Sequence, residues 1–114
     1  MKLIEDTVSL KELQSMAGAM FGDLVKAVVD IDRRIMALDA ELHADQEAVL
    51  LDQGSSQKSL WGINLYPELF GTTDFIEFDS MINLRPSQGN MSRGVDDLEV
   101  QQRICDIVKD MVKP

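Results

Sequence analysis

Hydrophobic residues recur at helical spacing near the start of the chain. Ser9 and Glu12 have the spacing of a capping box, in which the Ser9 side chain accepts a hydrogen bond from the third helical N–H while Glu12 reaches back. Apolar residues then recur every three or four positions as far as Gly22, which suits the left-handed end of a helix. This pattern predicts an amphipathic helix over residues 10–21.

Two apolar runs with many β-branched residues come next. They cover residues 25–31 and 35–38, on either side of three charged residues at 32–34. Such spacing is typical of a β-hairpin. Because the connection contains no glycine, we expect a bulge or a short irregular loop there and leave the register open.

Two further helices are predicted from their first turns. Asp45 and Glu47 lie where the positive end of a helix dipole favours carboxylates, which indicates a short helix over residues 44–53. Asp96 or Asp97 can cap a last helix. The apolar face of that helix consists of Val100, Ile104, Ile107, Val108 and Met111.

Two segments alternate between apolar and polar residues with the period of a strand. The first covers residues 61–66 and the second residues 75–85, and each is followed by a proline that closes it. The face of the second strand that we expect to pack on the core consists of Ile76, Phe78, Ile82 and Leu84. The face that we expect to stay outside the core consists of Glu77, Asp79, Asn83 and Arg85.

The predicted order is helix, two strands, helix, two strands, helix. Because the strands arrive in adjacent pairs, an α+β fold with a mainly antiparallel four-stranded sheet packed by helices is favoured over a doubly wound α/β fold. The 114 residues, 45% of them hydrophobic, fit one domain over residues 1–114. Four short strands leave two unblocked sheet edges, which predicts a homodimer.

Charge and composition exclude several classes of protein. Twenty acidic and eleven basic residues give a net charge of −9, which disfavours nucleic acid and anionic membranes as partners. No apolar run approaches the roughly 18 residues that a membrane span needs. A single cysteine and the absence of a signal-like segment indicate a reducing compartment, most simply the cytoplasm.

The first unusual polar segment, residues 39–47, holds four carboxylates and the only histidine. If the helix already begins at His43, that residue and Glu47 are one turn apart and could chelate a divalent metal ion, with Asp39 or Glu41 as a third ligand. The alternative interpretation is a solvated helix start, because the helix dipole alone favours acidic residues there. Nothing in the sequence requires a cofactor. A divalent metal ion is the cofactor that the first interpretation of residues 39–47 would imply.

The second unusual segment, residues 83–93, holds two arginines and no carboxylate. Guanidinium, hydroxyl and amide groups and glycine-permitted backbone N–H groups are the components of small-anion sites. The candidate anion-binding residues are Arg85, Ser87, Asn90, Ser92 and Arg93. The alternative is a surface loop whose arginines pair with the chain's own carboxylates.

The chain also resembles a known family over nearly its whole length. The stretches that carry the resemblance are His43–Glu47, Gly54–Gln57, Leu60–Pro67, Ile76–Ser80 and Ile82–Asn90. The family consists of short uncharacterised prokaryotic proteins catalogued as a domain of unknown function. The resemblance implies a single domain and assigns no activity, cofactor or catalytic residue.

The sequence is compatible with three functions. A non-enzymatic binding or interaction module with a small-anion site at residues 85–93 needs the fewest special residues. A small metal-dependent hydrolase would use His43, Asp45 and Glu47 and would hold an anionic substrate with Arg85 and Arg93, provided that the two segments meet in space. An RNA-binding or toxin-like nuclease module is disfavoured by the charge and by the 5% aromatic content.

Overall fold

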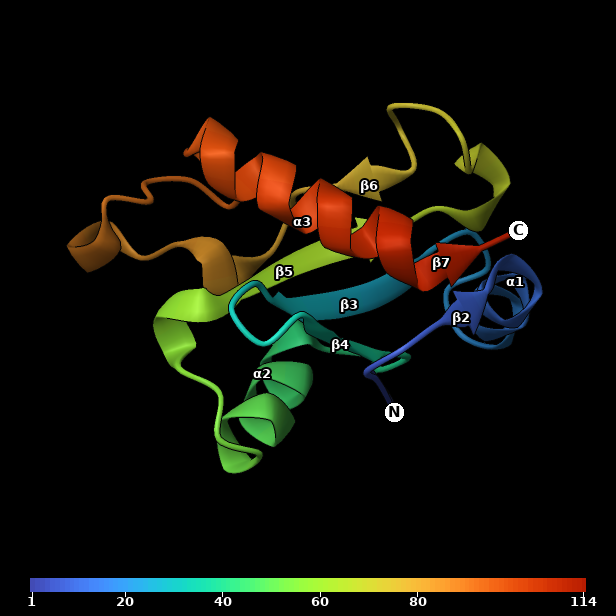
Figure 1. Ribbon diagram of the computed structural model, residues 1–114, viewed down its shortest axis with the longest axis horizontal. Helices are drawn as coiled ribbons and strands as arrows, with labels where there is room; N and C mark the ends of the chain where they lie inside the picture. Colours follow the sequence, from blue (N-terminus) through green and yellow to red (C-terminus); the bar gives the residue numbers. More distant parts are fainter.

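A five-stranded antiparallel sheet forms the centre of the protein (Figure 1). The computed structural model describes all of residues 1–114. The strands, in spatial order, are β1 (Lys2–Ile4), β4 (Ile35–Leu38), β3 (Val25–Asp30), β5 (Leu60–Leu65) and β6 (Ile76–Glu77). The prediction of one α+β domain with a mainly antiparallel sheet is confirmed, and the number of strands is corrected from four to five.

The additional strands are too short to show a period in the sequence. In β1 only Ile4 is buried, and the strand pairs with the far edge of β4. A separate pair of two-residue strands, β2 (Val8–Ser9) and β7 (Val112–Lys113), runs parallel and ties the two ends of the chain together. The edges of the main sheet are therefore β1 and β6, and the homodimer stays a prediction.

Three helices pack around the sheet, as predicted, and they are α1 (Leu10–Ala19), α2 (His43–Asp52) and α3 (Leu98–Met111). The Ser9 hydroxyl accepts from the N–H of Glu12 at 3.1 Å, and Asp97 caps α3 by accepting from the N–H of Glu99 at 2.9 Å. Helix α3 crosses one face of the sheet and α2 covers the other (Figure 1). None of the helices is both long enough and apolar enough to cross a lipid bilayer.

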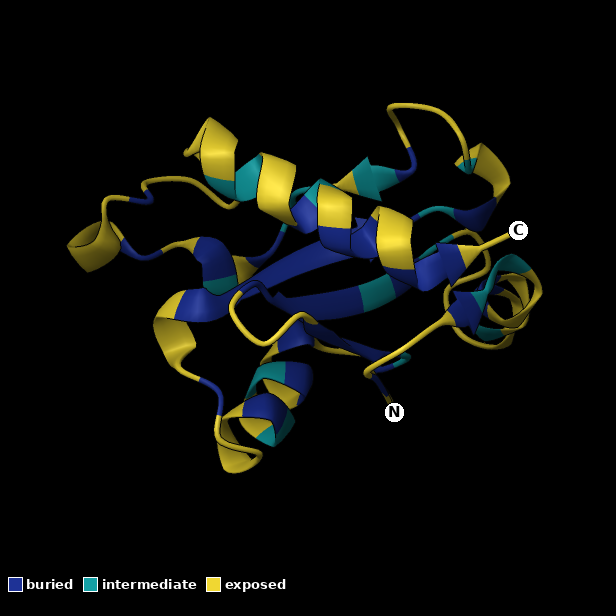
Figure 2. Ribbon diagram, in the orientation of Figure 1, coloured by how far each residue is buried: buried dark blue, intermediate teal, exposed yellow.

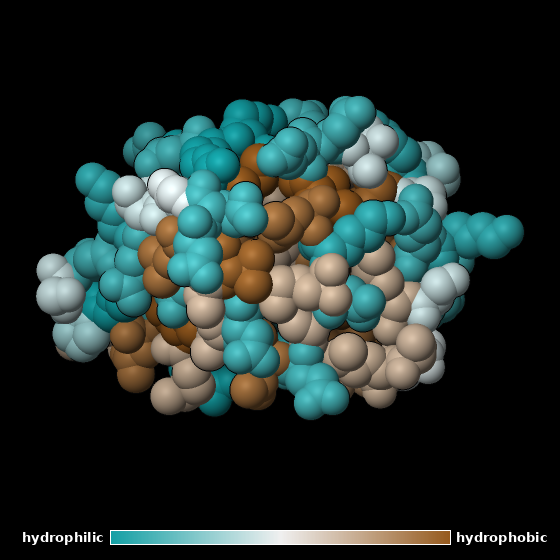
Figure 3. Space-filling view, turned by 90° about the horizontal axis from the view of Figure 1, so that it is seen from below, coloured by the Kyte–Doolittle hydropathy of each residue, from teal (hydrophilic) through white to brown (hydrophobic).

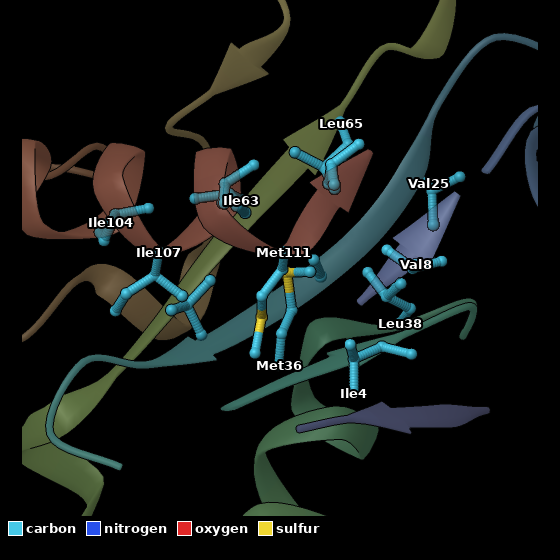
Figure 4. Packing of buried hydrophobic residues seen from close by; sticks show 14 of the residues in the cluster. Ile4, Val8, Val25, Met36, Leu38, Ile63, Leu65, Ile104, Ile107 and Met111 are labelled. Atoms are coloured by element: carbon cyan, nitrogen blue, oxygen red, sulfur yellow. The ribbon is translucent and has the colours of Figure 1, made fainter. Parts of the chain in front are cut away.

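The two faces of the sheet bury separate apolar clusters. Because side chains alternate along a strand, β3 directs Val29 to the α3 side and Val28 to the α2 side. Figure 4 shows Ile104, Ile107 and Met111 of α3 against the larger cluster. Strands β3 and β5 are consequently buried along almost their whole length (Figure 2).

The hairpin of β3 and β4 turns without glycine. Arg34 adopts a φ of 54°, and the Oδ1 of Asp30 accepts from the backbone N–H groups of Asp32 and Arg33 at 2.9 and 3.0 Å. An aspartate that bonds backbone groups two and three residues ahead replaces the usual glycine-based turn. The connection is a short turn over residues 31–34, without the bulge that was one of the two expectations.

The long strand predicted over residues 75–85 is wrong beyond Glu77. A short 3₁₀ turn, η3 (Met81–Asn83), follows Ser80, whose side chain caps it. Asn83 and Arg85, expected outside the core, are buried, while Leu84, expected inside, is 42% exposed. The alternating pattern failed because the polar side chains at 83 and 85 bind backbone groups of β5 and the residues before it.

Apolar side chains also reach the surface on the side of α2. Figure 3, which views the molecule from below Figure 1, shows hydrophobic side chains across the middle of this face, interrupted by hydrophilic ones. Leu42 and Met81 are among the most exposed large apolar residues of the chain, at 55% and 62%. Both line the cleft described next.

Candidate functional site

Residues from both unusual polar segments line one cleft of about 200 Å³. We name it the His43 cleft, after the first residue of α2. Its polar lining consists of Lys26, His43, Asn64, Asp79, Ser80 and Arg93, and its apolar lining of Leu42, Ala44, Met81 and Ile82. The sequence alone could not show that the two segments converge, and the structure shows that they do at His43 and Arg93.

Gly62, in the middle of β5, makes this convergence sterically feasible. A Cβ atom on Gly62 would lie 2.6 Å from both the Cβ and the Oγ of Ser80 and 3.2 Å from the Cγ of His43. Real Cβ atoms essentially never come within 3.0 Å of such atoms, and 3.2 Å is tighter than most of their contacts. The missing side chain of Gly62 therefore allows His43 and Ser80 to pack against the same point of the sheet.

His43 is held in one tautomer by the backbone. Its Nε2 lies 2.8 Å from the carbonyl oxygen of Ile63, and because a carbonyl only accepts, Nε2 carries the proton. The lone pair of Nδ1 then has no partner within the protein. Burial lowers the pKa of His43 below its ordinary value of 6.5, although the bond to Ile63 opposes the shift. The imidazole is therefore neutral at pH 7.

Two cations and one carboxylate give the cleft its charge. Arg93 donates from Nε to the Oδ1 of Asp79 at 2.7 Å, while its two terminal nitrogens bind no protein group. The Lys26 ammonium lies 5.4 Å from the centroid of the Phe21 ring. Among the residues that line the cleft, two are cations and one is a carboxylate, although the protein as a whole has a net charge of −9.

Arg85, the other arginine of the second segment, is directed into the protein. Its guanidinium donates to the carbonyl oxygens of Gln57 and Leu60, the latter at 2.6 Å, and lies 4.2 Å from the Trp61 ring centroid. Burial lowers the pKa of Arg85, and the charge of Glu47 opposes that shift. Arg85 therefore stabilises the start of β5 and is not free to bind an anion.

The remaining candidate anion ligands also lie outside the cleft. Asn90 donates to the carbonyls of Asn83, Ser92 and Gly94, and its Oδ1 accepts from the N–H of Asp96. The Ser92 hydroxyl donates to Asp96 at 2.5 Å, and Ser87 is exposed. Arg93 is the residue of the predicted set that reaches the cleft.

The candidate metal ligands do not form a metal site. The structure contains no group of three or more histidine, cysteine, aspartate or glutamate side chains that could hold a metal ion. His43 is buried against Ile63, whereas Asp45 is exposed and the charge of Glu47 acts on Arg85. The hypothesis of a metal held by His43, Glu47 and Asp39 gains no support.

Lys26, Asn64, Asp79 and Ser80 were missed as site residues. Lys26 and Asn64 are direct partners across β3 and β5, so their proximity depends on sheet register, which the sequence left open. The available signal was a lysine within a β-branched run and an asparagine within the mostly apolar segment 60–65. Asp79 and Ser80 were assigned to a strand that ends before them.

A larger hollow of about 500 Å³ lies at the start of α3. Asp32, Asp96 and Asp97 line it together with Lys58 and Arg103. The carboxylates already have protein partners, because Asp32 accepts from Ser59 and Arg103, Asp96 from Ser92, and Asp97 from the N–H of Glu99. Its mixed charge does not select a class of ligand.

A third hollow of about 390 Å³ is mostly apolar and lies between β6 and α3. Phe70, Phe75, Phe78 and Val108 contribute to its walls. Cys105 also lines it, and burial raises the pKa of this thiol, so the thiolate is disfavoured at neutral pH. Its polar side chains are those of Thr72, Thr73 and Lys109, and no residue of the lining is an activated nucleophile.

Comparison with known proteins identifies the family of this chain but assigns it no activity. Neither the curated proteins nor the solved structures include one that matches this chain. A family model described as "Protein of unknown function (DUF5674)" matches residues 2–111, which include every residue of the His43 cleft. The chain therefore belongs to the DUF5674 family.

Proposed function

We propose that this protein is a binding module and that its ligand is a small anion, such as a carboxylate or phosphate, held in the His43 cleft. The observation that carries the proposal is that two cations, Lys26 and Arg93, line the cleft with one carboxylate, Asp79, which pairs with the Nε of Arg93. A cleft of about 200 Å³ suits a small molecule better than a polymer.

The geometry leaves the required donors free. Asp79 engages only the Nε of Arg93, so both terminal guanidinium nitrogens can donate to an anion, with the fork geometry that suits carboxylate and phosphate. The Lys26 ammonium has no carboxylate partner within the protein. The Ser80 hydroxyl accepts from the N–H of Ile82 and keeps its own proton for a ligand.

Amide chemical shifts test the proposal directly. Inorganic phosphate, sulfate and acetate are titrated separately into the ¹⁵N-labelled protein, and we expect shifts at Asn64, Ser80 and Arg93. Arg93→Ala should weaken phosphate binding at least about tenfold, because it removes a charge-assisted hydrogen-bond donor. Lys11→Ala, which removes one exposed positive charge on α1, is the matched control and should leave binding unchanged.

Two results would contradict this function. One is the absence of shifts in the wild-type protein at tens of millimolar anion. The other is equal weakening in Arg93→Ala and Lys11→Ala, which would show that only the overall charge attracts anions.

A further inference from the structure

The His43 cleft contains hydrogen-bond acceptors that no protein donor reaches. Nδ1 of His43 is an acceptor, because Nε2 holds the ring proton against Ile63. Asp79 uses Oδ1 for Arg93, and its second carboxylate oxygen binds nothing. These two groups lie in the same cleft as the cations Lys26 and Arg93.

Asn64 also lines the cleft and carries a third unpaired acceptor, buried behind its surface. Its Nδ2 donates to the Glu77 carboxylate at 2.9 Å and lies 3.4 Å from the Asp79 carbonyl oxygen, so the amide orientation is determined. Its Oδ1 is buried and has no hydrogen-bond partner. Neither the Ser80 hydroxyl nor the Lys26 ammonium satisfies it.

Unpaired acceptors make a cleft discriminate between ligands. Water can bond to His43 Nδ1 and to the free Asp79 oxygen in the unliganded protein, but a ligand that displaces the water without offering a donor leaves them unsatisfied. A ligand that offers a donor restores the bonds. Sites built in this way reject analogues that lack the hydroxyl or N–H group.

We propose that the anion bound in the His43 cleft also carries a hydroxyl or ammonium group, as small hydroxy acids and amino acids do. This inference rests on the proposed function. The anionic group binds Lys26 and Arg93, and the hydroxyl or ammonium group donates to His43 Nδ1 and Asp79. The exposed apolar side chains of Leu42 and Met81, which line the same cleft, accommodate a short alkyl group.

Propionate, lactate and alanine form a matched set of probes. Propionate and lactate have the same charge and differ by one hydroxyl, and alanine replaces that hydroxyl with an ammonium. Dissociation constants are measured by amide shifts at pH 7.5, with inorganic phosphate titrated into a parallel sample. We expect lactate to bind about tenfold more tightly than propionate, the effect of one well-formed hydrogen bond.

A variant of His43 tests which acceptor is responsible. His43→Gln retains an N–H that can donate to Ile63 but has no atom in place of Nδ1, so the ratio of the lactate and propionate affinities should fall toward one. If this variant does not fold, the pH dependence of the lactate preference in the wild-type protein provides a second test. Protonation of His43 at lower pH turns Nδ1 into a donor, so the preference for lactate over propionate should decline. The charged groups that act on this ring are Lys26, Asp79 and Arg93.

The outcomes separate the two claims. Equal affinities for all three probes, with phosphate still bound, would overturn the inference and leave the proposed function in place. Failure of every anion to bind, phosphate included, would overturn the proposed function itself. A preference for lactate that persists in His43→Gln and at low pH would also contradict the role assigned to His43.

Discussion

The side chain of Asn83 occupies the place of a strand residue beside Gly62. Its Oδ1 accepts from the N–H of Gly62 at 2.8 Å, and its Nδ2 donates to the carbonyl of Gly62 at 2.9 Å. Strand β6 pairs with β5 only at Asn64 and Leu65, so the next pair of β5 backbone groups would otherwise remain unsatisfied inside the protein. One buried carboxamide thus extends the sheet beyond the end of its edge strand.

Asn83→Ala should therefore lower the free energy of unfolding by about 3 kcal/mol or more. The substitution leaves the two buried groups of Gly62 unpaired and also removes the bond from Nδ2 to the carbonyl of Arg93, at 2.9 Å. Urea unfolding followed by circular dichroism measures the change. Gln14→Ala, at an exposed position of α1, is the control and should change stability by less than about 0.5 kcal/mol. Similar stabilities for the two variants would show that the Asn83 bonds are unimportant.

Two glycines with opposite surroundings provide the next prediction. Gly62→Ala places a methyl group 2.6 Å from Ser80 and should destabilise the protein by about 2–3 kcal/mol, the usual cost of overpacking a tight core. Gly18→Ala, within α1, meets nothing within 4 Å and should stabilise it by about 0.5–1 kcal/mol. Thermal unfolding of the two variants, which carry the same chemical change, measures both effects.

The same glycine pair also tests the cleft. Displacement of Ser80 and His43 in Gly62→Ala should weaken phosphate binding, whereas Gly18→Ala should bind phosphate like the wild type. A folded Gly62→Ala protein with unchanged stability and unchanged binding would contradict the steric account of the His43 cleft.

Local patterns in the sequence were sufficient to predict most elements of the fold. The capping box at Ser9 and the β-branched run of β3 act through neighbouring residues, so their effects can be recognised without the tertiary structure. The segment after Glu77 could not be predicted in this way. Its alternation has the period of a strand, but the partners of Asn83 and Arg85 are backbone groups more than twenty residues away.

The residues of the cleft could be predicted only in part, again because contacts between residues far apart in the sequence decide where each side chain lies. The high density of polar residues in segments 39–47 and 83–93 indicated His43 and Arg93, and both line the cleft. Composition could not distinguish the two arginines of one loop, one buried on Trp61 and one facing a cleft. That difference arises from the tertiary contacts of the loop.

Arg85 supplies a prediction about stability that separates it from Arg93. Arg85→Ala removes the donors to two backbone carbonyls and the contact with Trp61, and should lower the free energy of unfolding by about 3 kcal/mol. Arg85→Lys should recover less than half of the loss, because an ammonium lacks the planar fork. Fluorescence of Trp61, the single tryptophan, reports the change directly.

The control for Arg85 is Arg103→Ala, which breaks a half-exposed ion pair with Asp32 and one bond to the carbonyl of Ile31, and should affect stability far less. A fully stable Arg85→Lys protein with native tryptophan fluorescence would mean that charge alone matters at this position.

The pH dependence of stability follows from the burial of His43. Its pKa is lower in the folded protein than the 6.5 expected of the unfolded chain, so the unfolded chain takes up a proton first as the pH falls. Stability linked to this group is complete above pH 6.5 and is lost as the pH falls from there through the folded-state pKa. The slope can reach about 1.4 kcal/mol per pH unit while only the unfolded chain is protonated.

Because His43 is the only histidine, its contribution can be isolated. Urea unfolding between pH 7.5 and 5.5 should show decreasing stability in the wild-type protein, and His43→Gln, which cannot titrate, should show a much flatter profile over the same range. The imidazole proton resonances give the folded-state pKa independently and should place it below 6.5. A measured pKa at or above 6.5, or parallel stability profiles for the two proteins, would mean that the ring is solvated and that its Nδ1 is not held in the neutral, accepting state that the cleft requires.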